Sequence, residues 1–304
     1  CPQEARGQHY GAITLDGLFV PIINDIMFKS VNDTKTLLHI GDTHFGHPCH
    51  CANRWQKFKD RYKNRKDVLA IGMGDYWDFS RWSDRKAMRR GGVSDSARDW
   101  MDSKVTDDIK RAADELSQFQ WLGMLEGNHD WVFSNGETAS ERLATELGTK
   151  YLGTCAYVYH RLNLHGGYAH VAHVAHHGTT SGAKTVVGSI NALEHWSKAF
   201  QAHIYAMGHD HSSFVLPCSY TPLFGRINRQ TGDIEILEHE SWFVRSGSML
   251  RGYVPNQRSY IATKAMPARR LSYPEIRIGV TRYIENGVRR LKPTIEGVNP
   301  SSYS

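Results

Sequence analysis

The chain has 304 residues, 40% of them hydrophobic and 11% aromatic, so it can bury one large core or at most two modest ones. Its 37 Lys and Arg residues only slightly exceed its 31 Asp and Glu residues; the net charge of +6 mildly favours a polyanionic substrate and equally fits a soluble surface. No stretch reaches the roughly 18 apolar residues of a membrane span, and residues 1–10 lack a signal-peptide pattern, so we expect no membrane association.

The five cysteines are not spaced as a disulfide framework. An odd number of cysteines in a long chain favours a reducing compartment, and we expect a cytoplasmic protein. Cys49, His50 and Cys51 could suggest a zinc site. A closed zinc site needs four ligands, however, and no CxxC pair elsewhere in the sequence can complete it. We therefore expect reduced thiols and no structural zinc centre.

The chain divides into three parts. Residues 1–33 mix Gly, Pro and apolar positions, and we interpret them as an N-terminal extension in which residues 17–23 form a short strand or a packed arm. Residues 34–264 are expected to form the catalytic domain. Residues 265–304 are basic, and we expect an irregular tail there.

Four short apolar runs predict buried strands, because each run stops at a glycine followed by polar residues. These runs are residues 36–40, 68–73, 121–126 and 203–207. Between them, apolar residues recur at steps of three and four from Val105 to Phe119, which predicts a helix with one apolar face. Alternating strands and helices indicate a layered α/β architecture, in which ligands gather at the carboxyl ends of the strands.

Further elements follow in the second half of the chain. Residues 168–175 alternate as a strand does, and residues 183–200 have the pattern of a helix. Residues 214–249 are expected to form paired strands, with a turn at residues 231–233.

Five short motifs at or after the predicted strands carry metal-binding and acid-base side chains. They are Asp42-Thr43-His44, Gly74-Asp75-Tyr76-Trp77-Asp78, Gly127-Asn128-His129-Asp130, His176-His177-Gly178 and Gly208-His209-Asp210-His211. Any one of them could arise by chance in a chain with 17 His residues, but five in order are difficult to attribute to chance. Imidazole, carboxylate and amide ligands suit borderline divalent ions, Mn first and then Fe or Zn, and the absence of thiolate argues against a structural zinc site.

This ordered set resembles the signature of calcineurin-like metallophosphoesterases, and the resemblance covers about residues 35–211. It implies an α/β fold, a four-layer sandwich of two mixed β-sheets packed face to face with helices on both outer sides. It also implies a dinuclear metal centre that hydrolyses a phosphate ester with a metal-activated water. By motif, Asp42, His44 and His211 would hold the first ion, Asn128, His177 and His209 the second, and Asp75 would bridge the two.

The same resemblance assigns two catalytic residues. His129 would protonate the leaving oxygen or steady the phosphoryl charge, and Asp78 would orient that imidazole and supply charge. A packed, purely structural histidine is the alternative for His129.

Some histidines are less certain candidates. His176 and His177 are adjacent, so only one of them is expected to reach the metals, and the family pattern favours His177, directly before glycine. His47 either lines the site or lies in a solvated loop. His160, His165, His170 and His173 have no comparable context, and we expect ordinary surface or core residues there.

The substrate depends on the loops that cover the site. The longest candidate, residues 79–104, interleaves Arg and Lys with Trp82, as suits a nucleic-acid strand, although a solvated helix followed by a flexible loop explains the pattern equally well. The expected function is therefore a phosphodiesterase or nuclease. The alternatives are a phosphomonoesterase acting on a nucleotide or protein, and a non-catalytic scaffold that has kept the fold.

Overall fold

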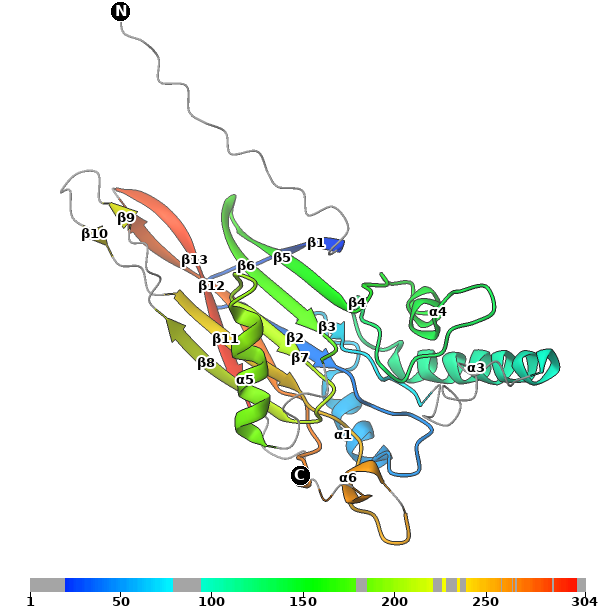
Figure 1. Ribbon diagram of the computed structural model, residues 1–304. Coiled ribbons are helices and arrows are strands. Elements are labelled where there is room, and N and C mark those ends of the chain that lie inside the picture. The colour runs from blue at the N-terminus through cyan, green and yellow to red at the C-terminus, as the bar shows by residue number, and fades with distance from the viewer. Residues whose placement is uncertain are drawn as a thin grey trace, which may run out of the picture.

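The computed structural model describes residues 20–78, 94–178, 185–220, 226–227, 234–235, 239–257, 259–263, 265, 267–285 and 287–299. Three hydrophobic clusters within these residues separate four layers. The largest-scale feature is a pair of β-sheets packed face to face, with helices on both outer sides (Figure 1). This confirms the α/β sandwich of two mixed sheets that the resemblance to calcineurin-like metallophosphoesterases implies.

The first sheet has six strands in the order β1-β5-β6-β7-β11-β8. They are β1 (Val20–Met27), β5 (Cys155–Leu164), β6 (Gly167–His176), β7 (Ile204–Met207), β11 (His239–Ser246) and β8 (Ser213–Tyr220). The sheet is mixed, because β6 and β11 lie parallel to β7 whereas β5–β6 and β11–β8 are antiparallel pairs. A separate antiparallel pair joins β9 (Arg226–Ile227) to β10 (Ile234–Glu235).

The second sheet has five strands in the order β13-β12-β2-β3-β4. They are β13 (Val288–Val298), β12 (Glu275–Glu285), β2 (Thr34–Ile40), β3 (Val68–Gly72) and β4 (Trp121–Met124). Strands β2, β3 and β4 are parallel neighbours, and all five residues of β3 are buried. Continuous burial explains why these strands appear in the sequence as unbroken apolar runs.

Helices cover the outer face of each sheet. α1 (Ala52–Tyr62), α3 (Asp95–Leu116) and α4 (Ala139–Glu146) pack on the five-stranded sheet, and α5 (Val186–Ser197) packs on the six-stranded one (Figure 1). A short helix, α6, spans Tyr260–Thr263. Ser94 caps the start of α3, since its side chain accepts a hydrogen bond from the backbone N–H of Ala97, and the helix buries the apolar face predicted from Val105 onward. Within the described residues, no helix is both long and apolar enough to cross a membrane.

Most predicted elements are confirmed, with boundary shifts. The four strands before the glycines are β2, β3, β4 and β7, and the alternating segment is β6. The predicted helix at 183–200 is α5, and the paired strands expected at 214–249 are β8 and β11. The predicted turn at residues 231–233 and the basic part of the loop at 79–93 lie outside the described residues.

Both ends of the described chain are more regular than the sequence suggests. The expectation of irregular structure beyond Ala265 is wrong, because β12 and β13 form a hairpin that extends the five-stranded sheet. The basic side chains that suggested a tail lie mostly on the exposed part of this hairpin, where its burial pattern turns to exposed residues. At the other end, β1 pairs in parallel with β5 and forms an edge of the six-stranded sheet.

Candidate metal centre

The candidate ligands lie on loops that follow five strands of the two sheets. Because β2, β3 and β4 are parallel, and β6 and β7 are parallel, the carboxyl ends of these strands gather at one edge of the sandwich. Backbone hydrogen bonds join the first two loops: the N–H of Asp42 donates to the carbonyl of Gly74 at 2.9 Å, and the N–H of His44 donates to that of Asp75 at 3.1 Å. Segments more than thirty positions apart are thereby fixed against each other.

Two glycines before the polar residues allow the loops to approach closely. A Cβ on Gly74, whose φ is +90°, would lie 2.6 Å from Nδ1 of His177. A Cβ on Gly127 would lie 2.1 Å from Oδ1 of Asp75. Only glycine fits at these positions, which explains physically why Gly precedes Asp75 and Asn128 in the motifs.

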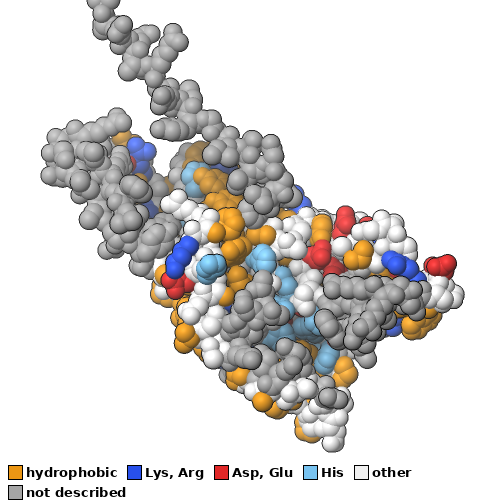
Figure 2. Space-filling view, viewed as in Figure 1, with side chains coloured by type: hydrophobic (Ala, Val, Ile, Leu, Met, Phe, Trp, Pro, Cys, Tyr) orange, Lys and Arg blue, Asp and Glu red, His pale blue; other side chains and the backbone are white. Residues whose placement is uncertain are grey.

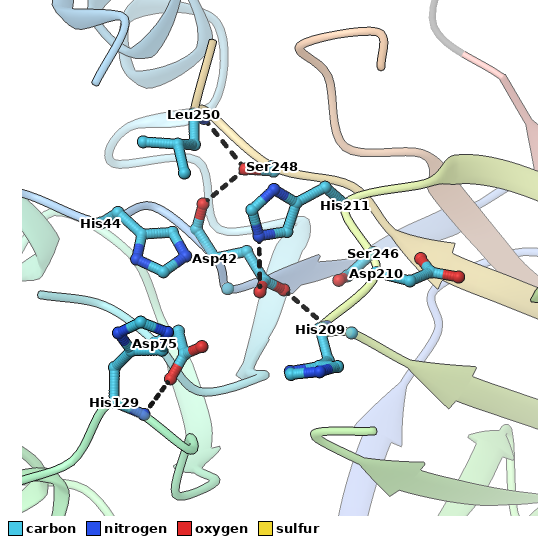
Figure 3. A network of polar contacts seen from close by, with 12 residues as sticks. Asp42, His44, Asp75, His129, His209, Asp210, His211, Ser246, Ser248 and Leu250 are labelled. Carbon is cyan, nitrogen blue, oxygen red and sulfur yellow. Dashed lines mark hydrogen bonds and ion pairs between the residues drawn. The ribbon is translucent and has the colours of Figure 1, made fainter. Parts of the chain in front are cut away.

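Asp42, His44 and His211 form the first group of donors. Each offers one ligand atom, and these atoms all lie within 4.8 Å of one another. Nε2 of His211 lies 3.4 Å from Oδ1 of Asp42, while Oδ2 of Asp42 accepts a hydrogen bond from the backbone N–H of His209 at 2.9 Å (Figure 3). Nε2 of His44 and Oδ1 of Asp42 are buried without a hydrogen-bond partner. Buried nitrogen and oxygen atoms that make no hydrogen bond within the protein are suited to binding a metal ion.

Asp75, His177 and His209 form the second group. Nε2 of His177 lies 3.3 Å from Oδ2 of Asp75. Oδ1 of Asn128 lies 2.9 Å from Nε2 of His177 and 2.7 Å from Nδ1 of His209, so the amide oxygen shares this cluster. All seven residues that the motifs propose as ligands are therefore brought to the same edge of the molecule. Figure 2 shows histidine side chains gathered near the centre of one face.

Burial and charge oppose each other at the two carboxylates. Burial raises the pKa of Asp75, but the nearby imidazoles of His177, His129 and His44 lower it by more. The pKa of Asp75 therefore lies well below its ordinary value. Burial likewise raises the pKa of Asp42, but the nearby imidazole of His211 lowers it by more, so that the pKa lies below its ordinary value. In turn, burial lowers the pKa of His177, but Asp75 raises it to about 9. Buried, negatively charged carboxylates beside nitrogen and oxygen donors are suited to binding divalent metal.

A third group joins His44, Asp78 and His129. Oδ1 of Asp78 lies 2.9 Å from Nδ1 of His129 and 3.3 Å from Nδ1 of His44. Burial raises the pKa of Asp78, but hydrogen bonds to His129 and His44 hold it far below its ordinary value. The His129 side chain is 30% exposed, against 2% for Asp75, so His129 lies where the buried ligands meet solvent. The structure thus pairs the two residues that the resemblance proposes as catalytic.

The backbone of the site is unusual. Nine described non-glycine residues have positive φ, and five of them are proposed ligands: Asp42, His44, Asp75, His209 and His211. This left-handed region costs free energy for residues with a Cβ, and such residues concentrate at functional sites. The strands therefore end in a conformation that turns the side chains toward one another, and the surrounding structure has to maintain it.

The structure also separates the two adjacent histidines. Nδ1 of His177 lies 2.7 Å from the carbonyl of Met73, which leaves Nε2 directed at the cluster. Nδ1 of His176 accepts a hydrogen bond from the N–H of Gly178, and its ring packs against Trp196. Geometry therefore favours His177 as the ligand.

Three further residues singled out in the sequence, His47, Cys49 and Cys51, belong to none of the three donor groups found in the described residues. Nε2 of His47 lies 3.9 Å from Asp78, at the margin of the third group. Cys49 and Cys51 are buried free thiols, and within the described residues no donor cluster includes them.

Three residues that sequence reasoning left without a role support the loops. The hydroxyl of Ser248 donates to the carbonyl of Asp42 at 2.8 Å (Figure 3). Asp210 and Arg245 are both buried, with Nε of Arg245 3.5 Å from Oδ2 of Asp210. Asp210 lies inside the motif Gly208-His209-Asp210-His211, so the sequence already indicated that it lies near the site. Arg245 and Ser248 lie outside all five motifs, and only tertiary structure reveals them.

A cavity of about 420 Å³ lies beside the third group. Its walls include Phe45, which follows His44, and Trp77, which precedes Asp78. The two ring centroids are 6.0 Å apart. Arg111, Asp114 and Glu115 also line the cavity, so its walls are partly aromatic and partly charged.

Fold and site together define a two-sheet α/β protein with a candidate dinuclear metal centre at the carboxyl ends of its strands. No family model matches the sequence, and no curated protein matches it. A single-mutant form of Vps29 from Entamoeba histolytica matches with 12% identity over 86% of this chain and 99% of that chain, at a TM-score of 0.40. Wild-type Vps29 from the same organism, in complex with Zn²⁺, matches with 13% identity over 86% and 98%, at a TM-score of 0.37.

A conserved uncharacterized protein from Streptococcus pneumoniae, described as a predicted phosphoesterase, matches with 11% identity over 86% of this chain and 99% of that chain. The TM-score is 0.32. The resemblance of this chain to calcineurin-like metallophosphoesterases rests on its own ordered motifs, its two mixed sheets and the placement of the motifs at the strand ends.

Proposed function

We propose that this protein is a metal-dependent phosphoester hydrolase. The observation that carries the proposal is the meeting of two donor groups at one edge of the sandwich, each built on a buried carboxylate. The ligands would be Asp42, His44 and His211 for one ion and Asn128, His177 and His209 for the other, with Asp75 between them. Nitrogen and oxygen donors without thiolate favour Mn, with Fe or Zn as the other candidates.

Two bound ions would supply charge stabilisation for the phosphoryl transition state and an activated water as nucleophile. The chain's own contribution is the pair of His129 and Asp78. Because Asp78 lies against Nδ1 of His129, it fixes the ring so that Nε2 is the atom offered to the substrate. His129 would then deliver a proton to the leaving oxygen, and the pKa of Asp78, held low by the two histidines, keeps that carboxylate charged as its partner.

Within this class, we propose a phosphodiester substrate, a nucleic acid being the leading candidate. The cavity beside Trp77 supports this assignment, because a diester carries groups on both sides of the phosphorus and needs space beyond the metal centre. Aromatic walls suit stacking with a base, and the net positive charge of the chain favours a polyanion.

The test is a substrate panel on the full chain, stripped of metal and reloaded separately with Mn, Zn or Fe. The substrates are p-nitrophenyl phosphate, its bis ester, cyclic nucleotides, and single- and double-stranded DNA. We expect metal-dependent turnover with the bis ester or DNA preferred over the monoester. A preference for the monoester would make the protein a phosphomonoesterase. Tight metal binding with no turnover of any substrate would instead support a scaffold.

A further inference from the structure

The loop from Gly208 to Ser212 carries two proposed ligands in a strained conformation. His209 has φ +71° and His211 has φ +59°, both in the left-handed region. Residues of this kind keep such a conformation only when their surroundings enforce it. Two contacts reach from this loop to Asp42: the N–H of His209 donates to Oδ2, and Nε2 of His211 lies 3.4 Å from Oδ1.

Arg245, on β11, binds this loop from inside the protein. Its side chain is 1% exposed. Nη1 donates to the carbonyl of Gly208 at 3.0 Å, directly before His209. Nε and Nη2 donate to the carbonyl of Ser189 on α5, at 3.2 and 2.9 Å. The guanidinium therefore joins β11, α5 and the first residue of the loop through one planar group.

Asp210 links the same guanidinium to the middle of the loop. It stands between the two histidines, and its Oδ2 lies 3.5 Å from Nε of Arg245. Its Oδ1 accepts a hydrogen bond from the N–H of Ser212 at 2.9 Å, and the Ser212 hydroxyl lies 3.2 Å from that of Ser189. Asp210 faces away from the metal ligands, as Figure 3 shows, so its carboxylate serves the loop and not the ions.

We propose that Arg245 is a positioning residue that sets the affinity for both metal ions. Through Gly208 and Asp210 it fixes the backbone from which His209 and His211 project, and these histidines belong to different donor groups. This inference rests on the proposed function, because it needs ions at the two groups. A buried ion pair specifies one arrangement of its surroundings, since either charge left alone would be costly.

The experiment measures Mn²⁺ and Zn²⁺ affinity by calorimetry on the full chain, for wild type, Arg245→Met and Arg245→Lys. We expect Arg245→Met to bind both ions about 10- to 100-fold more weakly, the usual range when a group that orients a ligand is lost. Arg245→Lys should lose less affinity, because its charge still reaches Asp210 while the fork to Ser189 and Gly208 is gone. Wild-type affinity in Arg245→Met would overturn the proposal.

Phe243→Leu is the matched control, because Phe243 is buried on the same strand but packs against Tyr205. It should lower the unfolding temperature of the metal-free protein and leave metal affinity unchanged. If Phe243→Leu weakens metal binding as much as Arg245→Met does, Arg245 is merely structural and the proposal fails.

A second variant covers the case in which Arg245→Met does not fold. Asp210→Asn keeps the acceptor for Ser212 and removes the charge that Arg245 faces. We expect it to weaken metal binding in the same direction, and combining it with Arg245→Lys should add little, because both changes break one pair. If the two single variants, Asp210→Asn and Arg245→Lys, both bind metal with wild-type affinity, the proposal is refuted. Failure of the proposed function is a separate result, since wild type itself would then bind no ions or hydrolyse no ester.

Discussion

Two groups of histidines in the described part of this molecule lie in opposite electrostatic surroundings. In the candidate centre, histidines lie beside buried carboxylates. In the core, His39 of β2, His160 of β5 and His173 of β6 form a chain of imidazole contacts. Nε2 of His39 lies 3.0 Å from Nε2 of His173, and Nε2 of His160 lies 3.4 Å from Nδ1 of His173. Asn24 completes the chain, 3.0 Å from Nδ1 of His160.

The difference shows in the pKa values. Burial lowers the pKa of His39 to about 3 and that of His160 to about 4, and it holds the pKa of His173 well below its ordinary value. His177 is nearly as buried, yet Asp75 raises its pKa to about 9. Burial alone therefore yields a neutral histidine that ties the two sheets together. Burial beside a carboxylate yields a site that attracts positive charge.

Chelation should have the largest effect on activity, because it acts on the candidate centre and leaves the core histidines in place. EDTA treatment is expected to abolish phosphoesterase turnover, with recovery on adding Mn²⁺, because the ions provide most of the barrier reduction.

Metal content per chain should fall in both sites for Asp75→Ala and chiefly in the first for His44→Ala. The core variant His160→Gln should keep both ions and its activity. Two tightly bound ions in Asp75→Ala would show that this carboxylate does not bridge.

His129→Ala should retain both ions and lose about a hundredfold to ten-thousandfold in kcat, the usual contribution of general acid catalysis. The loss should be larger for an alkyl than for a nitrophenyl ester, because the poorer leaving group needs the proton more. Asp78→Asn should show a smaller loss of the same kind. Parallel kcat and metal measurements on both esters test this. Loss of an ion from His129→Ala would make this residue a ligand.

Acid should destabilise the protein through the core chain. Below pH 6.5 these histidines bind protons in the unfolded chain but stay neutral in the folded protein. As the pH falls, the free energy of unfolding therefore decreases by about 1.4 kcal/mol per pH unit for each histidine that is protonated only in the unfolded state. For His160 this loss begins near pH 6.5 and ends near pH 4, where the folded state is protonated as well. The measurement is the free energy of unfolding in urea between pH 4.5 and 7.5, plotted against pH. The slope of this plot should be smaller in His160→Gln, by the amount that corresponds to about one proton.

The smallest effect is expected for His176→Ala. Its ring packs on Trp196 instead of entering the donor groups, so both ions and most of kcat should remain. His177→Ala, one position along, should lose the second ion. Metal analysis of the two variants side by side decides the assignment, and an ion lost from His176→Ala would reverse it.

Sequence reasoning reached much of the fold because its signals are local. Each ligand-bearing strand is a continuous apolar run that stops at glycine, and α3 shows its apolar face from Val105 to Leu116. The sequence reading overlooked α1, although Trp55, Phe58 and Tyr62 recur at helical spacing on its buried side. The hairpin of β12 and β13 was missed because its basic residues resemble those of a tail. Arg245 could not be found, because its partners Ser189 and Gly208 are distant in the chain.

The pairing of β12 with β2 has a consequence for the order of events during biosynthesis. Tyr273 donates a hydrogen bond to the carbonyl of Gly41, which lies 232 positions earlier and directly before Asp42. The ribosome therefore releases β2 long before it synthesises Tyr273 and β12, which hold β2 in place. Contacts this distant slow folding, commonly to milliseconds or seconds. We expect the nascent chain to acquire metal affinity only after β12 has left the ribosome.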